Sequence, residues 1–187
     1  MKDALIFLID TFTRLYLLIL LLRFWLPIVR ANFRNPVAQG VLRYTSPMVV
    51  PVRRYIPAIG KLDTATVLVA LAIQVVASII MLVISRGLAF LETVSSAFPS
   101  IVGSALVELA SLSVVMFIVA LALRVIFGFF GRYMGPLSDL LNDLTDPLLG
   151  PVRKIIPPLG VVDLSAYIVF ILLIALNMVV ADLRPAF

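Results

Sequence analysis

The stretch that decides the fold occurs twice: residues 45–63 read TSPMVVPVRRYIPAIGKLD, and residues 145–163 read TDPLLGPVRKIIPPLGVVD. Threonine, proline, valine, arginine, isoleucine, glycine and aspartate recur at the same spacing in both copies. Each copy stands just before a long apolar run. A repeat of fixed period indicates the architecture of a chain before any local pattern does, so we expect two equivalent structural units.

The composition predicts that lipid surrounds much of the chain. Of the 187 residues, 63% are hydrophobic and 13% are charged, whereas soluble domains carry about 25% charged residues. A helix needs about 20 apolar residues to cross a bilayer. Four runs approach or reach this length, at residues 5–28, 62–84, 106–127 and 164–180. We therefore predict an all-α integral membrane protein with four transmembrane helices.

Each unit contains two of these crossings, so both copies have the same orientation in the membrane. The predicted fold is a single membrane domain, residues 1–187, made of two parallel repeated hairpins related by a pseudo-two-fold axis along the membrane normal. Repeat one covers residues 1–85, an external loop covers 86–104, and repeat two covers 105–187. The run at residues 5–28 is too long for a signal peptide, and no cleavage site follows it, so we expect it to remain as a helix.

Basic residues lie mainly in the two repeated loops. These loops carry Arg30, Arg34, Arg43, Arg53, Arg54, Lys61, Arg132, Arg153 and Lys154. The opposite side carries only Lys2, Arg86 and Arg184. Because cytoplasmic loops of membrane proteins are enriched in lysine and arginine, we predict that both repeated loops are cytoplasmic and that both termini are outside.

Each cytoplasmic loop has two parts. After Pro136, leucines at 137, 140, 141 and 144 alternate with polar residues as in an amphipathic helix, and residues 37–44 give a weaker version. The second part is bracketed by prolines, which we expect at a helix first turn and at the end of that turn. This segment is too short to cross, so we predict an interfacial or re-entrant turn. Its geometry depends on Pro47, Pro51, Pro57, Gly60, Pro147, Pro151, Pro157 and Gly160.

The repeated segment also carries the charged candidates for a site. Asp63 and Asp163 stand where an N-cap would accept amide hydrogens from the following helix. The basic residues have two interpretations: they pair with these aspartates across the turn, or they bind an anion, a lipid headgroup or a partner. These basic residues are Arg53, Arg54, Arg153 and Lys154.

Besides Asp63 at the start of the second run, five charged residues lie within the apolar runs, where charge is costly. Arg23 and Arg124 stand near cytoplasmic ends, so they either snorkel to headgroups or have a partner within the bundle. Asp10 and Arg14 are four residues apart and pair if both lie on a helix; they form a functional candidate at membrane depth or an interfacial pair if the helix begins later. Glu108 is expected as an interfacial carboxylate at the outer end of the third run.

The residue types present limit the chemistry. The chain has no cysteine and no histidine, so the commonest metal ligands and general base are missing. We expect no metal site, no cofactor and no catalysis. An enzyme would depend on carboxylates, and the closest cluster, at residues 139–146, falls on the expected amphipathic helix. No nucleic-acid-binding motif is present, so direct nucleic-acid binding is not expected.

The doubled pattern resembles the YggT family of integral membrane proteins, which includes the YlmG proteins. The residues that carry the resemblance are Leu-Arg at 22–23 and 123–124, then Pro36 and Pro136, then T-x-P-x-x-x-P-V-R-[RK]-x-I-P-x-x-G-x-x-D in both halves. The length with two units is similar to the proteobacterial form. The resemblance implies a multi-pass protein of the bacterial inner membrane without an established catalytic residue. Relatives are associated with cell division, with haem attachment during cytochrome assembly and with ion homeostasis under osmotic stress.

Two functions fit these observations. The first is a non-enzymatic organising or assembly factor of the cell envelope or of a membrane complex, acting through the repeated basic turns. Its expected partners are the bilayer with anionic headgroups, an unidentified membrane or cytoplasmic protein, and a second copy of the chain. The alternative is a small ion channel or transporter, which the few polar side chains inside the apolar runs disfavour.

Overall fold

The computed structural model describes residues 1–60, 62–129, 135–154 and 163–183. Within these ranges the chain is helical apart from its connections. The six helices are α1 (Lys2–Ile28), α2 (Pro36–Arg53), α3 (Thr64–Arg86), α4 (Phe90–Phe129), α5 (Pro136–Arg153) and α6 (Leu164–Asp182). Each half of the chain therefore has a long helix, an 18-residue helix and a second long helix, in that order.

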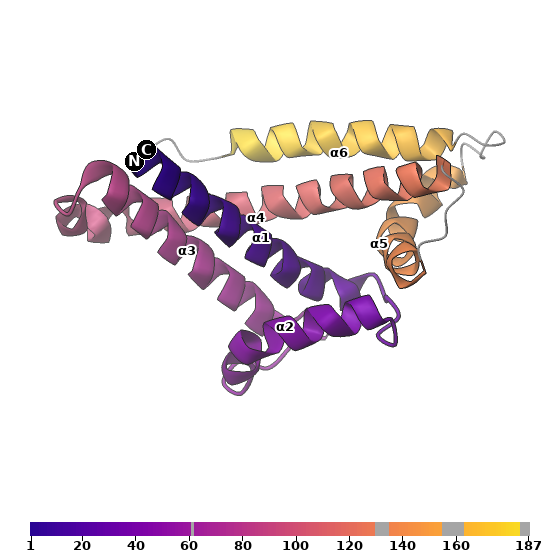
Figure 1. Ribbon diagram of the computed structural model, residues 1–187, viewed down its shortest axis with the longest axis horizontal. Helices are drawn as coiled ribbons and strands as arrows, with labels where there is room; N and C mark the ends of the chain where they lie inside the picture. The colour runs from indigo at the N-terminus through magenta and orange to yellow at the C-terminus, as the bar shows by residue number, and fades with distance from the viewer. Residues whose placement is uncertain (61, 130–134, 155–162, 184–187) are drawn as a thin grey trace.

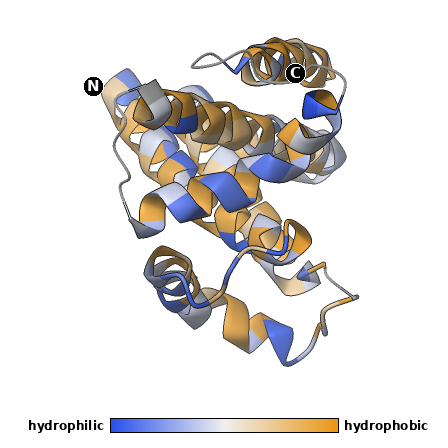
Figure 2. Ribbon diagram, turned by 90° about the vertical axis from the view of Figure 1, so that its right-hand side faces the viewer, coloured by the Kyte–Doolittle hydropathy of each residue, from blue (hydrophilic) through white to orange (hydrophobic). Residues whose placement is uncertain are grey.

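Four of these helices, α1, α3, α4 and α6, are long and apolar enough to cross a membrane. They correspond to the four predicted spans, which supports a multi-pass membrane protein. The shorter α2 and α5 lie across one end of the long helices, and the start of α1, the α3–α4 connection and the end of α6 lie toward the other end (Figure 1). Hydrophilic residues gather on the α2 and α5 end, which faces the viewer in Figure 2.

The third long helix begins much earlier than the sequence predicted. We expected a loop over residues 86–104, but α4 starts at Phe90 and continues through Pro99. The hydroxyls in this stretch meet the helix's own backbone, because Ser96, Ser100 and Ser104 each donate to the carbonyl three residues earlier. The serines of this stretch are thus accommodated within the helix.

The prediction for Pro51 and Pro151 is wrong. We placed them in the first turn of a short segment, but each lies near the end of a continuous 18-residue helix, α2 or α5. Pro36 and Pro136 take the first helical positions instead, where a missing amide hydrogen costs nothing. The later prolines are tolerated because Val49 and Leu149, which are fully buried, hold these last turns against the bundle.

The connection between α2 and α3 is a tight turn. Gly60 has a positive φ of 63°, a conformation that favours glycine, and Ile59 and Leu62 exchange two backbone hydrogen bonds around it. The Thr64 hydroxyl donates to the carbonyl oxygen of Pro57 at 2.8 Å. These contacts bring the end of α2 back to the start of α3. The equivalent Pro157 and Gly160 lie outside the described residues.

The two halves do not pack as a closed two-fold pair. Within each half the long helices pack together, α1 on α3 and α4 on α6, and α3 also packs along α4. A two-fold axis would require α6 to pack along α1 as extensively as α3 packs along α4, and the described residues of α1 and α6 do not pack in this way. The packing is therefore open, with α6 at one edge of the molecule (Figure 2).

Candidate functional site

The repeated segment builds an ion-pair network at the junction of α1, α2 and α3. Asp63 is the N-cap of α3: its carboxylate accepts the Thr66 hydroxyl at 2.7 Å and the Thr66 amide at 3.4 Å. The Arg53 guanidinium, at the end of α2, donates to the same carboxylate. Asp63 thus joins the last turn of α2 to the first turn of α3.

Arg23 of α1 completes this first network from inside the bundle. Its Nη1 donates to the Thr45 hydroxyl at 2.8 Å, and its Nε lies 3.6 Å from Asp63 Oδ2. The snorkelling interpretation is wrong for Arg23, because only 4% of its side chain is exposed. The fully buried Thr45 hydroxyl in turn donates to the Val41 carbonyl oxygen at 2.7 Å. A buried arginine needs such partners, since an unpaired buried charge is strongly unfavourable.

Repeat two builds a second network from the equivalent residues. Arg124 Nη1 donates to the fully buried Thr145 hydroxyl at 2.6 Å and to Asp146 Oδ1 at 2.7 Å. Arg153 Nε donates to Asp163 Oδ2 at 3.2 Å, and Arg153 Nη1 lies 3.8 Å from Asp146 Oδ1. Asp163 is the N-cap of α6, accepting the amides of the first helical turn. Both repeats therefore join three helices through an arginine pair and a capping aspartate.

The two networks differ in charge. In repeat one, Ser46 stands where repeat two has Asp146, and it accepts a hydrogen bond from Arg23 at 3.3 Å. Two arginines therefore share the single carboxylate of Asp63, whereas Arg124 and Arg153 share two carboxylates. The first network carries one excess positive charge, and the second is neutral.

Both capping aspartates are held in the charged form. Burial opposes ionisation of Asp63, but hydrogen bonds from Thr66 and the charge of Arg53 outweigh it, so the pKa of Asp63 lies below its usual value. Burial also opposes ionisation of Asp163, and Arg153 with the α6 amides outweighs it, so the pKa of Asp163 is lowered too. The ion pairs are therefore fully formed at neutral pH.

The remaining basic residues of the motif are placed differently. Arg54 and Lys154 each follow the last helical residue of α2 or α5 and are exposed. Tyr55 is 86% exposed beside Arg54. The sequence motif therefore holds two kinds of basic residue: Arg53 and Arg153 point to the capping aspartates, and Arg54 and Lys154 face outward.

A separate charged cluster links the repeats within the long helices. Arg14 Nε lies 2.8 Å from Asp10 Oδ2, as the spacing on α1 predicted, and Arg14 Nη2 lies 2.9 Å from Glu108 Oε1 on α4. Because α4 begins at Phe90, Glu108 lies well inside this helix and is not at its outer end. Farther along the bundle, the Ser111 hydroxyl donates to Asn177 of α6 at 2.8 Å.

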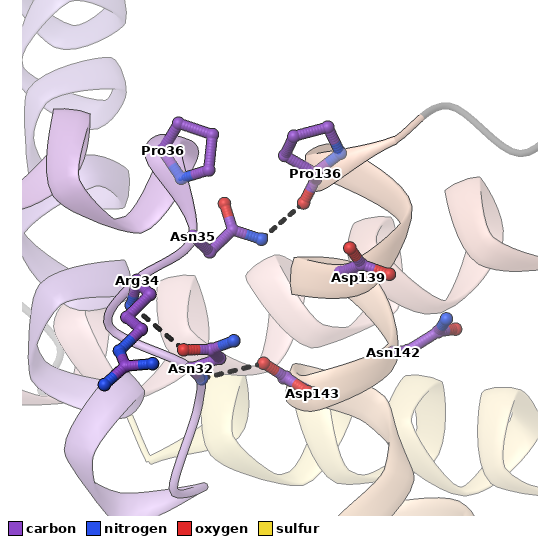
Figure 3. Close-up of a pocket in the computed structure, with 8 residues that line it drawn as sticks. All are labelled: Asn32, Arg34, Asn35, Pro36, Pro136, Asp139, Asn142 and Asp143. Carbon is purple, nitrogen blue, oxygen red and sulfur yellow. Dashed lines mark hydrogen bonds between the residues drawn. The ribbon is translucent and has the colours of Figure 1, made fainter.

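The two repeats also meet in a polar pocket of about 390 Å³ at the start of α2 and α5 (Figure 3). Asn35, the N-cap of α2, donates to the Pro136 carbonyl oxygen at 2.6 Å. The Asn32 amide donates to Asp143 at 2.9 Å, and the Arg34 amide donates to Asn32 at 3.0 Å. These contacts fix α2 relative to α5.

Sequence reasoning missed several participants. Thr45 and Thr145 recur in the motif, yet their hydroxyls were given no role. Arg23 and Arg124 recur along with them, and this joint recurrence was the signal that could have indicated the contact. Asp146 was interpreted only as a surface carboxylate, and Ser46, the equivalent residue in repeat one, was not considered. Asn35 was missed because residues 32–35 have no counterpart that repeats.

The fold and the networks define a class: an all-helical protein with four apolar helices able to cross a bacterial membrane and polar junctions at one end of the bundle. The chain belongs to the CCB3/YggT family, which it matches over residues 2–84 and 103–184. These two segments cover all of α1, α2, α5 and α6, α3 except its last two residues, and α4 from residue 103 onward. No solved structure matches the chain.

Relatives from proteobacteria match along almost their whole length. A Pseudomonas aeruginosa protein is 37% identical over 97% of this chain and 90% of its own length. The Escherichia coli K12 protein YggT is 33% identical over 98% of this chain and 93% of its own length. A Vibrio alginolyticus protein is 32% identical over 97% of this chain and 95% of its own length. All three are described as uncharacterized, with no enzymatic activity given.

Proposed function

We propose that this protein is a non-catalytic organising or assembly factor of the bacterial inner membrane, which docks a partner protein on the cytoplasmic end formed by α2 and α5. The observation that carries the proposal is the outer surface at the end of α2. Arg54 and Tyr55 are exposed there. They directly follow the last turn of α2, which the Arg53–Asp63 ion pair holds against α3. A rigid position for an exposed cation and aromatic side chain suits a docking surface.

The rest of the α2 surface has the same character. Arg43 is exposed, and so are Tyr44 and Met48. Arginine, tyrosine and methionine are the residues enriched at protein interfaces, and arginine and tyrosine dominate binding energy. We define the α2 docking surface as Arg43, Tyr44, Met48, Arg54 and Tyr55. Its charge favours a partner segment rich in aspartate or glutamate.

The proposal refines the role of the four basic residues in the motif. Arg53 and Arg153 are engaged by aspartates and have a structural role, so they position the surface without contacting the partner. Arg54, and Lys154 on the other repeat, supply the contacts. The orientation is a prediction from the positive-inside bias, which favours the cytoplasm for the α2 and α5 end.

The polar groups inside the long helices support packing over conduction. Arg14 bridges Asp10 and Glu108, and Ser111 bonds to Asn177, so these polar side chains are engaged in contacts with one another. Interhelical polar contacts of this kind stabilise membrane bundles. A conducting pathway would instead need polar groups directed toward water.

Two experiments test the proposal. Charge reversal of the α2 docking surface, Arg43→Glu with Arg54→Glu, should abolish co-purification of the partner from membranes while insertion is unchanged. Lys2→Glu, at the opposite end of the bundle, is the matched control and should leave co-purification intact. Purified protein in liposomes should give no selective ion flux. Robust selective flux would establish the channel alternative and contradict the proposal.

A further inference from the structure

The carboxylate of Asp146 lies between the two arginines of the second network. Its Oδ1 accepts a hydrogen bond from Arg124 Nη1 at 2.7 Å and lies 3.8 Å from Arg153 Nη1. The Asp146 side chain is 56% exposed, whereas that of Arg124 is 19% exposed. Repeat two therefore holds an anion between an inner and an outer arginine, at a place that is open to the surroundings.

Repeat one has the same place without the anion. The shift between the two copies of the repeated motif makes Ser46 the equivalent of Asp146. The Ser46 hydroxyl accepts a hydrogen bond from Arg23 Nη1 at 3.3 Å and donates to the Leu42 carbonyl oxygen. It is therefore engaged with its own helix, and it supplies no negative charge to Arg23 or Arg53.

The first network lacks an acceptor as well as a negative charge. The Asp63 carboxylate already accepts hydrogen bonds from Arg53 and from the Thr66 hydroxyl. Buried Arg23 Nε has no hydrogen-bond partner among the described residues, since its distance of 3.6 Å from Asp63 Oδ2 is too long. The Arg53 side chain is 46% exposed, so it can donate to a further acceptor from outside. An external anion, at the place that Asp146 has in repeat two, supplies the missing charge and an acceptor.

This place lies at the boundary of the membrane-spanning part. Asp63 directly precedes α3, which is long and apolar enough to cross a membrane. Val67 and Leu68, in the first turns of α3, are exposed, and apolar side chains exposed on a spanning helix contact lipid chains. Phospholipid phosphates lie directly outside the hydrocarbon layer. They are therefore level with the start of α3.

We propose that the phosphate of an anionic phospholipid binds between Arg23 and Arg53, where repeat two has Asp146. Its single negative charge balances the excess positive charge of the first network. The planar guanidinium of arginine matches phosphate geometry, because it donates two parallel hydrogen bonds. Basic pockets between transmembrane helices bind lipid headgroups through such contacts. A zwitterionic phospholipid also brings an ammonium group, so we expect it to bind more weakly.

The lipid site is separate from the α2 docking surface. Arg23 is buried and Arg53 is held by Asp63, and neither belongs to that surface. A carboxylate of a docked protein is the other anion that could fill the site. The level of the site favours the lipid, because lipid phosphates lie at the start of α3 whereas a docked protein approaches from the aqueous side.

Lipid retention in native mass spectrometry tests the proposal on the full chain. The protein is released from nanodiscs that contain equal amounts of phosphatidylglycerol and phosphatidylcholine, and its bound lipids are counted. We expect one retained phosphatidylglycerol per chain. Ser46→Asp places a carboxylate in the site and should remove this lipid, and Arg53→Gln should weaken its binding about tenfold. Gln39→Asp adds the same charge at an exposed position of α2, and this matched control should retain the lipid.

The reciprocal variant gives an independent test. Asp146→Ser removes the internal anion of repeat two, so it should create a second site and retain a second phosphatidylglycerol. Thermal unfolding in detergent adds a readout that does not depend on retention. Phosphatidylglycerol should raise the midpoint of the unchanged protein more than that of Ser46→Asp.

The proposal is overturned if Ser46→Asp retains phosphatidylglycerol as the unchanged protein does, if Gln39→Asp loses it equally, or if phosphatidylcholine is retained as well. A missing second lipid in Asp146→Ser would contradict the equivalence of the two places. Equal stabilisation by inorganic phosphate would assign the site to free phosphate. Displacement of the lipid by a polyglutamate peptide would assign it to an acidic protein segment. Either of these last results also overturns the lipid site.

Discussion

Arg23 and Asp63 form an ion pair in which both side chains are buried, with 4% and 7% exposed and Nε 3.6 Å from Oδ2. That distance is too long for a hydrogen bond, so Coulomb attraction holds the two groups together. Arg53 approaches the same carboxylate from the outside, and its side chain is 46% exposed. Asp63 therefore pairs with a buried arginine and a half-exposed arginine at once, so the two arginines depend on it to different degrees.

Removing the charge of Asp63 should be strongly destabilising. Asp63→Asn leaves Arg23 buried without an anion, which costs about 3–5 kcal/mol of unfolding free energy. Arg53→Gln should cost about 1 kcal/mol or less, because an exposed pair is screened by solvent. Denaturant unfolding in detergent micelles measures both. Asp163→Asn is the matched comparison and should cost less than Asp63→Asn, because Arg124 and Arg153 keep Asp146. If Asp63→Asn and Asp163→Asn lower the unfolding free energy equally, the proposed difference between the two networks is contradicted.

Exchanging the residue that distinguishes the two networks should have opposite effects in the two repeats. Ser46→Asp adds a second carboxylate between Arg23 and Arg53 and should raise the unfolding free energy by about 1 kcal/mol. Asp146→Ser removes a carboxylate from Arg124 and Arg153 and should lower it. The same denaturation experiment measures the two variants. If Ser46→Asp destabilises the protein, the first network has no unsatisfied positive charge.

The lowered pKa values of Asp63 and Asp163 predict a loss of stability in acid. A carboxyl group whose pKa is lower in the folded state binds more protons when the chain unfolds, so its stabilisation is complete above the unfolded value of about 3.9 and falls as the pH drops through the folded value. The midpoint of thermal unfolding should be constant from neutral pH to about pH 5 and decrease below it. In Asp63→Asn with Asp163→Asn the decrease should be smaller. If the unfolding midpoint of this double variant falls as much in acid as that of the unchanged protein, groups other than Asp63 and Asp163 cause the loss of stability.

Orientation in the membrane is testable with single cysteines. Tyr55 and Leu88 are both strongly exposed, at the α2 end and in the α3–α4 connection respectively. We expect an impermeant maleimide to label Leu88→Cys in cells with a permeable outer membrane, and to label Tyr55→Cys only after the inner membrane is opened. The reverse labelling would place α2 and α5 outside and remove the basis for a cytoplasmic partner.

The sequence was sufficient for the features that depend on composition and periodicity. Four apolar runs predicted four long helices, and the aspartates before two of them occupy the N-cap positions of α3 and α6. Leucines on one face of residues 137–144 predicted an amphipathic segment, and Leu140, Leu141 and Leu144 are buried in α5. These features follow from local rules that tertiary packing reinforces.

Features that depend on contacts distant in sequence were not predictable in the same way. The helix continues through Pro47 and Pro51 because buried residues on its inner face offset the missing hydrogen bonds, and burial is a tertiary property. For Arg23 the sequence left two alternatives, lipid headgroups or a partner within the bundle, because only its depth was visible. Its partners Thr45 and Asp63 come from two other elements. Glu108 meets Arg14 across the repeats, a pairing that neither helix encodes by itself.

The most direct test of the proposed function is photo-cross-linking from position 55 in living cells. A photoreactive amino acid at Tyr55 should give a discrete adduct with one partner protein, identifiable by mass spectrometry, and Arg54→Glu should remove that adduct. The same probe at Leu88, at the other end of the bundle, should not give it. The account is contradicted if position 55 yields lipid adducts alone, or if the adduct forms equally from Leu88 or persists in Arg54→Glu.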